Sequence, residues 1–582
     1  MAIEEIDIEM EDLLCLIGEN NTGKSAVLLA LETFFTTGSG GMKPEYFRKW
    51  KTEDRIERIE EKIVVEVTFH KLTARERKEY HTRLDGEEYV LKKVYALIDE
   101  KIETLYLTKG KIWNEGWLNE EYEGEIDRNF LKERGLESIL PDKGKIIKQI
   151  ISNARIKYIE ENQSSLTFRT DYKKNPKGIQ PYCDKFIPEF HLIPAVKEAK
   201  DELKVTQTSK MGELVKSVVN RIMKRHPKFK ELEKNIREIK KLFSKDPEKP
   251  EQRLPGLAEL ESNLTSFLKQ SMDADILIEA EPPHINDIFK TGLRLSVDDG
   301  ISGEIDQKGH GLQRIFIVSM FFTYAKFIKE LRRKYPEENQ ETDFNKSLIF
   351  AFEEPELYLH PQLQRRMYED FKELSSADQI IFCTHSPFFL NLNDYKSICI
   401  LKRASKVDPP KKFQYLGELF QSTEKKDRQK RYRILNEIDP KSELFFAKKI
   451  ALVEGATEKY SFQIIAKRLK IFRHDVTIVD CGSKESIPLY QMVLNNFKLP
   501  YLVIYDKDPD NLESKETSKE IETLATKGDG KTQVLTPDFG GVAESDSLRG
   551  ANKKPLAAIE YFNNSENKIS EQIEKITKII YE

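Results

Sequence analysis

Residues 13–25 read LLCLIGENNTGKS, a short apolar run that ends in a polar loop containing glycine. The part from Gly18 to Ser25 fits G-x-x-x-x-G-K-[ST], a pattern in which backbone N–H groups surround phosphate oxygens. It predicts a buried strand at residues 13–17 and a helix at residues 25–35, whose positive N-terminal end would face the anion. An ordinary glycine turn before a helix is the structural alternative.

The side chains of this loop have expected roles toward a nucleotide. Lys24 would reach the β- and γ-phosphates, and the hydroxyl of Ser25 would bind Mg²⁺. Glycine lets the backbone approach the phosphates closely. We assign the other nucleotide contacts of the loop to Asn20, Asn21 and Gly23. The loop therefore predicts that the chain binds ATP together with Mg²⁺.

Two later apolar runs would deliver the groups that ATP hydrolysis needs. Residues 347–352, SLIFAF, precede Glu353 and Glu354. We assign Glu353 to the metal ion and Glu354 to the polarisation of the attacking water. Residues 380–384, IIFCT, precede His385, which would sense the γ-phosphate. A solvated acidic turn and a structural histidine are the alternatives.

Composition limits the classes of protein to which this chain can belong. Its 582 residues exceed one core and suggest roughly two to four domains. The net charge of −4 leaves no global basic field, so local patches would make any nucleic-acid contacts. The five cysteines are scattered, which fits a reducing cytoplasm rather than a disulfide framework or a zinc site. No apolar run reaches the ~18 residues of a membrane span, and the acidic N-terminus is unlike a signal peptide.

The last third of the chain holds three apolar runs that end in acids or glycine: residues 450–453, 476–479 and 501–505. Parallel strands would bring Glu454, Asp506 and Asp508 to one edge of a small sheet. Such a cluster of carboxylates is costly unless it is protonated or binds a cation, and Mg²⁺ or Mn²⁺ prefers oxygen ligands. Solvated acidic loops on the same fold are the alternative.

Four motifs of the first 403 residues together resemble the ABC-type ATPases of the SMC and RecF kind: GENNTGKS, KGHGLQR, LIFAFEEPELYLHP and FCTHSP. The resemblance implies that Gly309 and Gly311 belong to a signature loop that completes the ATP site of a second subunit, so a dimer is expected. Here His310 stands between the glycines, where such loops usually carry serine. Members of this group normally begin with one more strand, which we expect this chain to lack.

The C-terminal part looks like a Toprim domain, and the combination resembles the overcoming-lysogenization-defect (OLD) family of nucleases, which includes the Gabija nuclease subunit. By that likeness Glu454, Glu458, Asp506 and Asp508 are metal ligands or support them. Asp538 or Glu544 would add a distal acid. Lys554, or its neighbour Lys553, would stabilise the charge that develops on the phosphate.

The expected architecture is α/β, with a P-loop ATPase followed by a Rossmann-like Toprim domain. We expect ATPase parts at residues 1–195, including an antiparallel β-lobe at 60–170, and at 276–403. A helical insert would occupy residues 196–275 and take part in dimerisation. A linker at 404–446 and the Toprim domain at 447–582 would complete the chain.

The expected function is an ATP-regulated DNA endonuclease or nickase that uses Mg²⁺ or Mn²⁺, acting in the cytoplasm in defence against phage. One alternative is a RecF-like DNA-binding ATPase with an inert Toprim domain. Another is an effector subunit that is silent until a partner protein or a retron nucleic acid releases it.

Overall fold

The structure is a computed structural model. It describes residues 3–582 apart from residues 37, 39–40, 52–56, 80–83, 120–121, 142–144, 163, 175–186, 196–226, 244–253, 270–277, 279–295, 335–346, 404, 406–407, 420–428, 430–431, 434–435, 437, 508–511, 546–547 and 549–554. In the part described, no helix is both long enough and apolar enough to cross a membrane.

A six-stranded sheet forms the ATPase domain, in the order β14-β13-β1-β12-β11-β8. All neighbours are parallel except β13 and β14. The central strands are buried on both faces, which is typical of a parallel sheet covered by helices. The strands are β1 (Leu13–Gly18), β8 (Glu189–Ile193), β11 (Leu348–Glu353), β12 (Gln379–Thr384), β13 (Ile398–Lys402) and β14 (Lys411–Gln414). The strands expected at residues 13–17, 347–352 and 380–384 are therefore confirmed, the second beginning one residue later than expected.

Helices cover both faces of this sheet. Helix α1 (Lys24–Phe35) follows the glycine loop and packs Val27, Leu28 and Leu31 against the face that carries Leu14 and Leu16. The opposite face, with Leu13, Cys15 and Ile17, packs against helices α11 (His310–Lys334) and α12 (Pro361–Ser375). Residues 3–12 contain no strand, although Ile3, Ile6, Ile8 and Met10 pack on the α1 side.

The β-lobe is an antiparallel sheet of four strands, β4 (Lys62–Phe69), β5 (Tyr89–Ile98), β6 (Lys101–Trp113) and β7 (Phe168–Lys174). Exposure alternates along β4, as its alternating sequence predicts. One face packs on α1 through Leu91 and Phe34. The ammonium of Lys93 donates to the carbonyls of Thr33 and Thr36, both at 2.7 Å, and so caps the last turn of α1.

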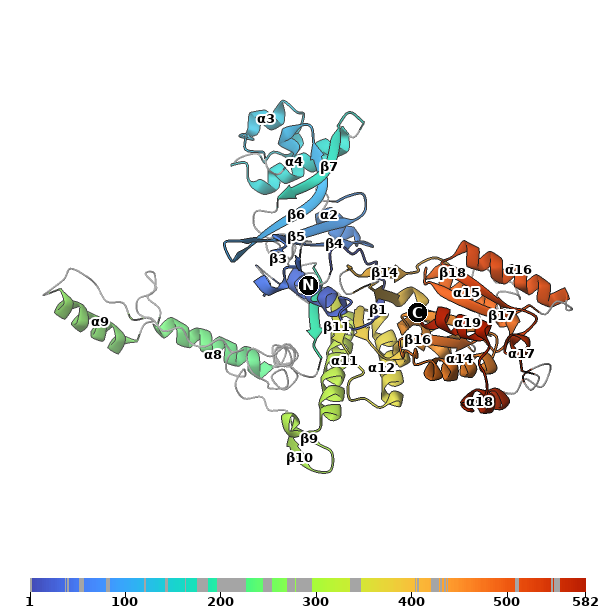
Figure 1. The fold of residues 1–582 in the computed structure, drawn as a ribbon. Coiled ribbons are helices and arrows are strands. Elements are labelled where there is room, and N and C mark those ends of the chain that lie inside the picture. Colours follow the sequence, from blue (N-terminus) through green and yellow to red (C-terminus); the bar gives the residue numbers. More distant parts are fainter. Residues whose placement is uncertain are drawn as a thin grey trace.

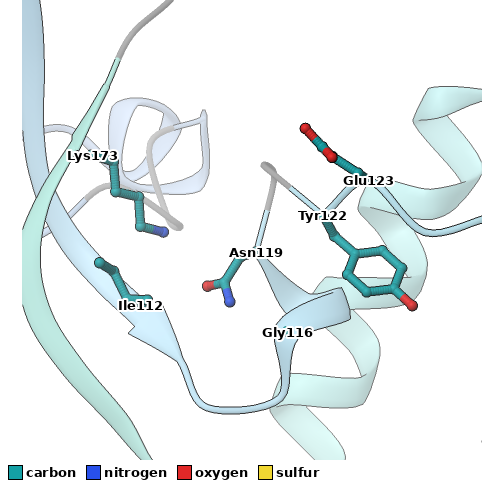
Figure 2. Close-up of a pocket in the computed structure, with 6 residues that line it drawn as sticks. All are labelled: Ile112, Gly116, Asn119, Tyr122, Glu123 and Lys173. Carbon is teal, nitrogen blue, oxygen red and sulfur yellow. The ribbon is translucent and has the colours of Figure 1, made fainter.

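Shorter elements surround these four strands: β2 (Lys49–Lys51), β3 (Glu57–Ile59), α2 (Ala74–Glu79), α3 (Arg128–Lys132) and α4 (Lys148–Glu161). Alternation does not predict α3 and α4, which pack around Trp117 and Leu131 between β6 and β7. A pocket beside the end of β6 is lined by Ile112, Gly116, Asn119, Tyr122, Glu123 and Lys173 (Figure 2). None of these residues belongs to the motifs predicted to bind a ligand.

The helical insert is described at α8 (Pro227–Phe243) and α9 (Pro255–Leu268), which extend sideways from the ATPase domain (Figure 1). In the described part of the insert, five large apolar side chains are exposed: Ile239, Leu242, Leu254, Leu260 and Leu264. A small hairpin, β9 (Ser296–Asp298) and β10 (Ser302–Glu304), leads from the insert toward α11.

The C-terminal domain is a four-stranded parallel sheet in the order β16-β15-β17-β18. Its strands are β15 (Lys449–Val453), β16 (Val476–Asp480), β17 (Tyr501–Asp506) and β18 (Gly530–Leu535). Its helices are α14 (Ala456–Arg468), α15 (Ile487–Asn496), α16 (Leu512–Lys527), α17 (Phe539–Val542), α18 (Pro555–Asn563) and α19 (Glu571–Tyr581). The predicted small parallel sheet is confirmed.

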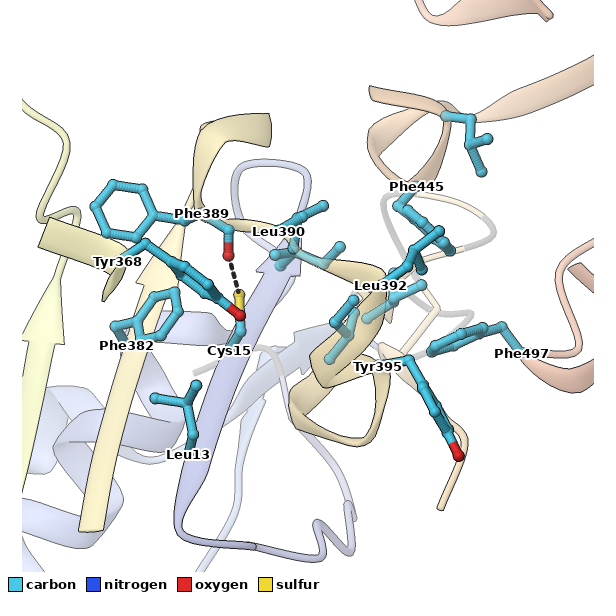
Figure 3. Packing of buried hydrophobic residues seen from close by; sticks show 14 of the residues in the cluster. Leu13, Cys15, Tyr368, Phe382, Phe389, Leu390, Leu392, Tyr395, Phe445 and Phe497 are labelled. Carbon is cyan, nitrogen blue, oxygen red and sulfur yellow. Dashed lines mark hydrogen bonds between the residues drawn. The ribbon is translucent and has the colours of Figure 1, made fainter. Parts of the chain in front are cut away.

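The two domains share a hydrophobic core. Cys15 of β1 belongs to the same buried cluster as Leu392, Phe445 and Phe497 (Figure 3). The ring centroids of Phe445 and Phe497 lie 5.4 Å apart. Within the range 404–446, expected to be a linker, the described elements are β14, which pairs with β13, and the 3₁₀ segment η13 (Asp439–Phe446), which packs between the domains.

Candidate functional site

The glycine loop has a backbone that only glycine can adopt at its first position. Gly18 has φ +153°, and a Cβ atom there would lie 2.2 Å from the carbonyl oxygen of Leu401. Gly23 has φ +97° at the N-terminus of α1. Because the end of β13 lies so close, the first position of the loop has no room for a side chain.

Lys24 is buried in this loop. Its ammonium donates to the carbonyls of Gly18 and Glu19, both at 2.9 Å. Burial lowers the pKa of Lys24, and the nearby carboxylates of Glu353 and Glu354 oppose that shift. Ser25 is exposed in the first turn of α1, while Asn20 and Asn21 are exposed at the loop's outer side.

The acids that follow β11 lie beside the end of β12. The N–H of Glu354 donates to the carbonyl of Cys383 at 2.9 Å, and Glu354 has φ +45°. Nε2 of His385 lies 4.0 Å from Oε1 of Glu354. Burial lowers the pKa of His385, and the charge of Lys24 adds to this effect. The parallel strands thus bring the glycine loop, Glu353, Glu354 and His385 to one edge of the sheet.

Two residues of this edge were not assigned a role from the sequence. Arg314 is fully buried and donates to the carbonyls of Glu353 at 2.6 Å and Pro194 at 2.7 Å. Burial lowers its pKa to about 10. Oε1 of Glu356 accepts a hydrogen bond of 2.6 Å from the N–H of His385. An arginine in the first turns of α11, directly before the apolar run IFIV, was the available signal for Arg314.

The expected signature loop begins α11. Gly309 precedes the helix, and a Cβ atom on Gly311 would lie 3.0 Å from the carbonyl oxygen of Tyr358. The ring centroids of His310 and Tyr358 are 5.3 Å apart. The loop therefore lies next to the segment after β11 of its own chain, and its contact with the nucleotide of a second chain stays a prediction.

A second group of acids lies at the edge of the C-terminal sheet. Glu454 follows β15 and Asp506 ends β17, and these two strands are parallel neighbours. Oε1 of Glu454 accepts a hydrogen bond of 2.6 Å from the N–H of Asp506. Burial raises the pKa of Glu454 to about 8, and the charges of Asp506 and Glu458 add to the rise. The structure therefore places Glu454 next to Asp506, as the sequence predicts.

Glu458 lies in the first turn of α14, which begins shortly after Glu454 in the sequence. It is buried, and its Oε2 accepts a hydrogen bond of 3.1 Å from the N–H of Gly455. Asp508, the other acid of the expected cluster, is outside the residues described. Among the residues described, no group of three or more His, Cys, Asp or Glu side chains is arranged to hold a metal ion.

The donor chemistry at this edge nevertheless suits Mg²⁺ or Mn²⁺. Glu454, Asp506 and Glu458 are carboxylates, and each raises the cost of ionising its neighbours in a buried setting. A divalent cation bound to carboxylate oxygens would offset that cost. Glu454 and Asp506 are the described residues that would hold such an ion.

Two protein families match the parts of the chain that carry these two groups of acids. The AAA ATPase domain family matches residues 2–390. The chain belongs to this family. Residues 445–508 match the TOPRIM domain of proteins similar to the overcoming lysogenization defect protein. The combination expected from the motifs, an ATPase followed by an OLD-type Toprim domain, is confirmed.

Three nucleases are similar to parts of the chain. The Old nuclease of Escherichia phage P2 is 27% identical over 351 residues, which are 58% of this chain and 57% of the relative. The OLD nuclease of Thermus scotoductus is 27% identical over 35% of this chain and 36% of the relative. Endonuclease GajA of Bacillus cereus is 25% identical over 35% of this chain and 31% of the relative. The chain thus spans less than two thirds of the length of each.

Among solved structures, an SmcHead bound to the C-winged helix domain of ScpA covers 70% of this chain at 13% identity. The match covers 92% of that chain, with a TM-score of 0.31.

The distal residues expected in the Toprim domain are only partly described. Oδ1 of Asp538 accepts a hydrogen bond of 2.7 Å from the N–H of Gly541, so this acid caps α17. Glu544 is exposed after that helix, with φ +54°. Lys553 and Lys554 are outside the residues described. The role of these residues stays a prediction.

Lys484 is a buried cation of the Toprim domain that sequence reasoning missed. It follows β16 in the stretch Gly482-Ser483-Lys484. Its ammonium donates to the carbonyl of Asp506 at 2.5 Å and to Oγ of Ser514 at 2.6 Å. A lysine directly after the Gly-Ser turn was the only local signal.

Proposed function

We propose that this protein is a DNA endonuclease or nickase that depends on a divalent metal ion, is regulated by ATP and acts in defence against phage. The contact between Glu454 and the N–H of Asp506, at the edge of a Toprim sheet, is the observation that carries the proposal. The printed names of the three relatives, nuclease and endonuclease, support the same activity.

The chemistry of cleavage would need both acids at this edge. A bound Mg²⁺ or Mn²⁺ would supply Lewis-acid activation of water and of the phosphodiester. Glu454 and Asp506 would hold and orient the ion. The carboxylate of Glu454 already accepts a hydrogen bond from the N–H of Asp506, which lies on the neighbouring strand. Glu458 would hold the start of α14 against Glu454 through Gly455.

Regulation by ATP is supported by contacts of η13 with both domains. Oγ of Ser442 donates to the carbonyl of Pro387 at 3.4 Å, two residues after His385. The adjacent Lys441 donates to the carbonyl of Asp480, at the end of β16, and to the hydroxyl of Tyr490. A movement of the His385 loop would therefore reach the edge of the Toprim sheet through a segment of eight residues.

The end of β13 provides a second connection. The buried ammonium of Lys402 donates to the carbonyl of Ala447 at 2.7 Å, just before β15 begins. The adjacent Arg403 donates to the carbonyl of Asn21 in the glycine loop at 3.2 Å. Two consecutive residues thus contact the nucleotide loop and the entry to the Toprim domain.

A plasmid nicking assay tests the proposal. We expect the purified protein to nick DNA with Mg²⁺ or Mn²⁺ and Asp506→Ala to abolish nicking. Asp529→Ala, an exposed acid of the same domain, is the matched control and should retain activity. Lys24→Ala should retain cleavage without ATP and lose every response of cleavage to ATP. Full nicking by Asp506→Ala would reject the nuclease assignment.

A DNA-binding ATPase with an inert Toprim domain is the second candidate. One observation favours it: the residues described contain no three-ligand group for a metal ion. ATP-dependent DNA binding together with no cleavage in either metal would establish this alternative. Cleavage that begins only when a partner protein or nucleic acid is added would instead identify an effector subunit.

A further inference from the structure

We propose that Lys484 is a positioning residue for the metal-binding edge of the Toprim domain, where its ammonium fixes the end of β17 beside the acids. The inference rests on the proposed function, because it concerns how Glu454 and Asp506 are held for a metal ion. No motif that pointed to the function includes this lysine.

Lys484 is almost fully buried, with 4% of its surface exposed. A buried ammonium is costly unless hydrogen bonds and opposite charges compensate it. Its donors reach the carbonyl of Asp506 and the hydroxyl of Ser514, in the first turn of α16. Nζ also lies 5.2 Å from the centroid of the Tyr505 ring. The lysine therefore joins the loop after β16 to the end of β17 and the start of α16.

These contacts fix Asp506 from two directions. Its N–H donates to Glu454, which follows β15, and its carbonyl accepts from Lys484, which follows β16. Strands β16 and β17 flank β15 in the sheet. With both peptide groups of Asp506 engaged, the direction in which its side chain leaves the backbone is set by two neighbouring strand ends.

The charge of Lys484 acts in the same place. Its ammonium donates to the carbonyl of Asp506, so it lies at the same strand end as that acid. A fixed cation lets several acids be held together before a divalent ion arrives. A lysine with a purely structural role would stabilise the fold without affecting how the edge binds an ion.

The test compares full-length wild-type protein with Lys484→Met, which keeps the length of the side chain and removes its charge and donors. We expect Mn²⁺ affinity, measured by isothermal titration calorimetry, to fall by about tenfold or more, as is usual when a group that orients metal ligands is lost. Lys484→Arg, which keeps the charge, should recover part of that loss. Lys531→Met, an exposed lysine on β18, is the matched control and should bind Mn²⁺ like the wild type.

Ser514→Ala keeps the test decisive if Lys484→Met does not fold. It removes one acceptor of the ammonium and should weaken Mn²⁺ binding by a smaller factor in the same direction. Unchanged or tighter Mn²⁺ binding in the folded variants overturns the inference, even if their melting temperatures fall. A wild-type protein that neither binds Mn²⁺ nor nicks DNA rejects the proposed function instead, so the two failures are distinguishable.

Discussion

The ATPase edge and the Toprim edge are built alike and differ in charge. Each lies where parallel strands end, and each places acids after an apolar strand. At the ATPase edge the acids face cations of the same chain, Lys24 and Arg314. At the Toprim edge, half-buried Glu454 and the buried Asp506 and Glu458 are opposed by Lys484. The comparison teaches that one fold principle can build a site for phosphates or a site for a cation, depending on the balance of charge at the strand ends.

The largest expected effect is a loss of DNA cleavage without a loss of nucleotide binding. Glu454→Gln keeps the size of the side chain and removes the negative charge, so DNA cleavage should fall by at least about a hundredfold. Nucleotide affinity, measured with a fluorescent ATP analogue, should stay within about twofold because the ATPase edge is intact. A parallel loss of ATP binding would contradict the independence of the two edges.

The next effect concerns the backbone of the glycine loop. Gly18→Ala forces a Cβ atom to within 2.2 Å of the Leu401 carbonyl, at a φ that disfavours alanine. We expect a destabilisation of at least about 2 kcal/mol and loss of ATP binding, measured by thermal unfolding and nucleotide titration. Gly256→Ala, in α9 with open space around the new methyl group, should leave both unchanged.

Arg314→Met should destabilise the ATPase edge more than the domain as a whole. The guanidinium holds the carbonyls of Glu353 and Pro194, and losing charged hydrogen bonds in a buried setting costs about 2–3 kcal/mol. ATP hydrolysis should fall further than ATP binding, because the acids after β11 lose their support. Arg333→Met, at an exposed position of the same helix, is the control for the loss of an arginine. Equal stability of the two variants would show that Arg314 does not support the ATPase edge.

The smallest effect concerns Lys402, which lies between the two edges. Burial lowers its pKa to about 8 from 10.5, and Glu19 only partly opposes this. Between these two pH values the unfolded chain binds more protons than the folded chain, so the contribution of Lys402 to stability rises with pH across that window. Wild-type melting temperature should therefore rise by a few degrees relative to Lys402→Met between pH 8 and pH 10. A difference that is constant with pH would show that Lys402 is not held as a buried cation.

Much of the fold and part of the site follow from local sequence. The glycine loop, the acids after residues 347–352 and the acid after residues 450–453 each stand within a few residues of the strand that positions them. Periodicity identifies such strands, and parallel pairing then brings their ends together. Helices α3 and α4 were missed because a few alternating strands were extended to the whole of residues 60–170.

Local sequence patterns did not predict the roles of Arg314, Lys402 and Lys484. Each donates to a backbone carbonyl far away in the sequence: Arg314 to Glu353, Lys402 to Ala447, and Lys484 to Asp506. A carbonyl has no sequence signature, because every residue carries one. These partners become visible only when strand order and register are known.

The sequence by itself determined the two families of domain, three strands of each sheet and the acids at the ends of those strands, because these depend on short-range spacing. Tertiary structure decided that β14 joins the ATPase sheet, and that β13 and η13 contact both domains. The physical reason is that burial and strand register place charges and carbonyls of distant segments within hydrogen-bonding distance, and no local pattern encodes those distances.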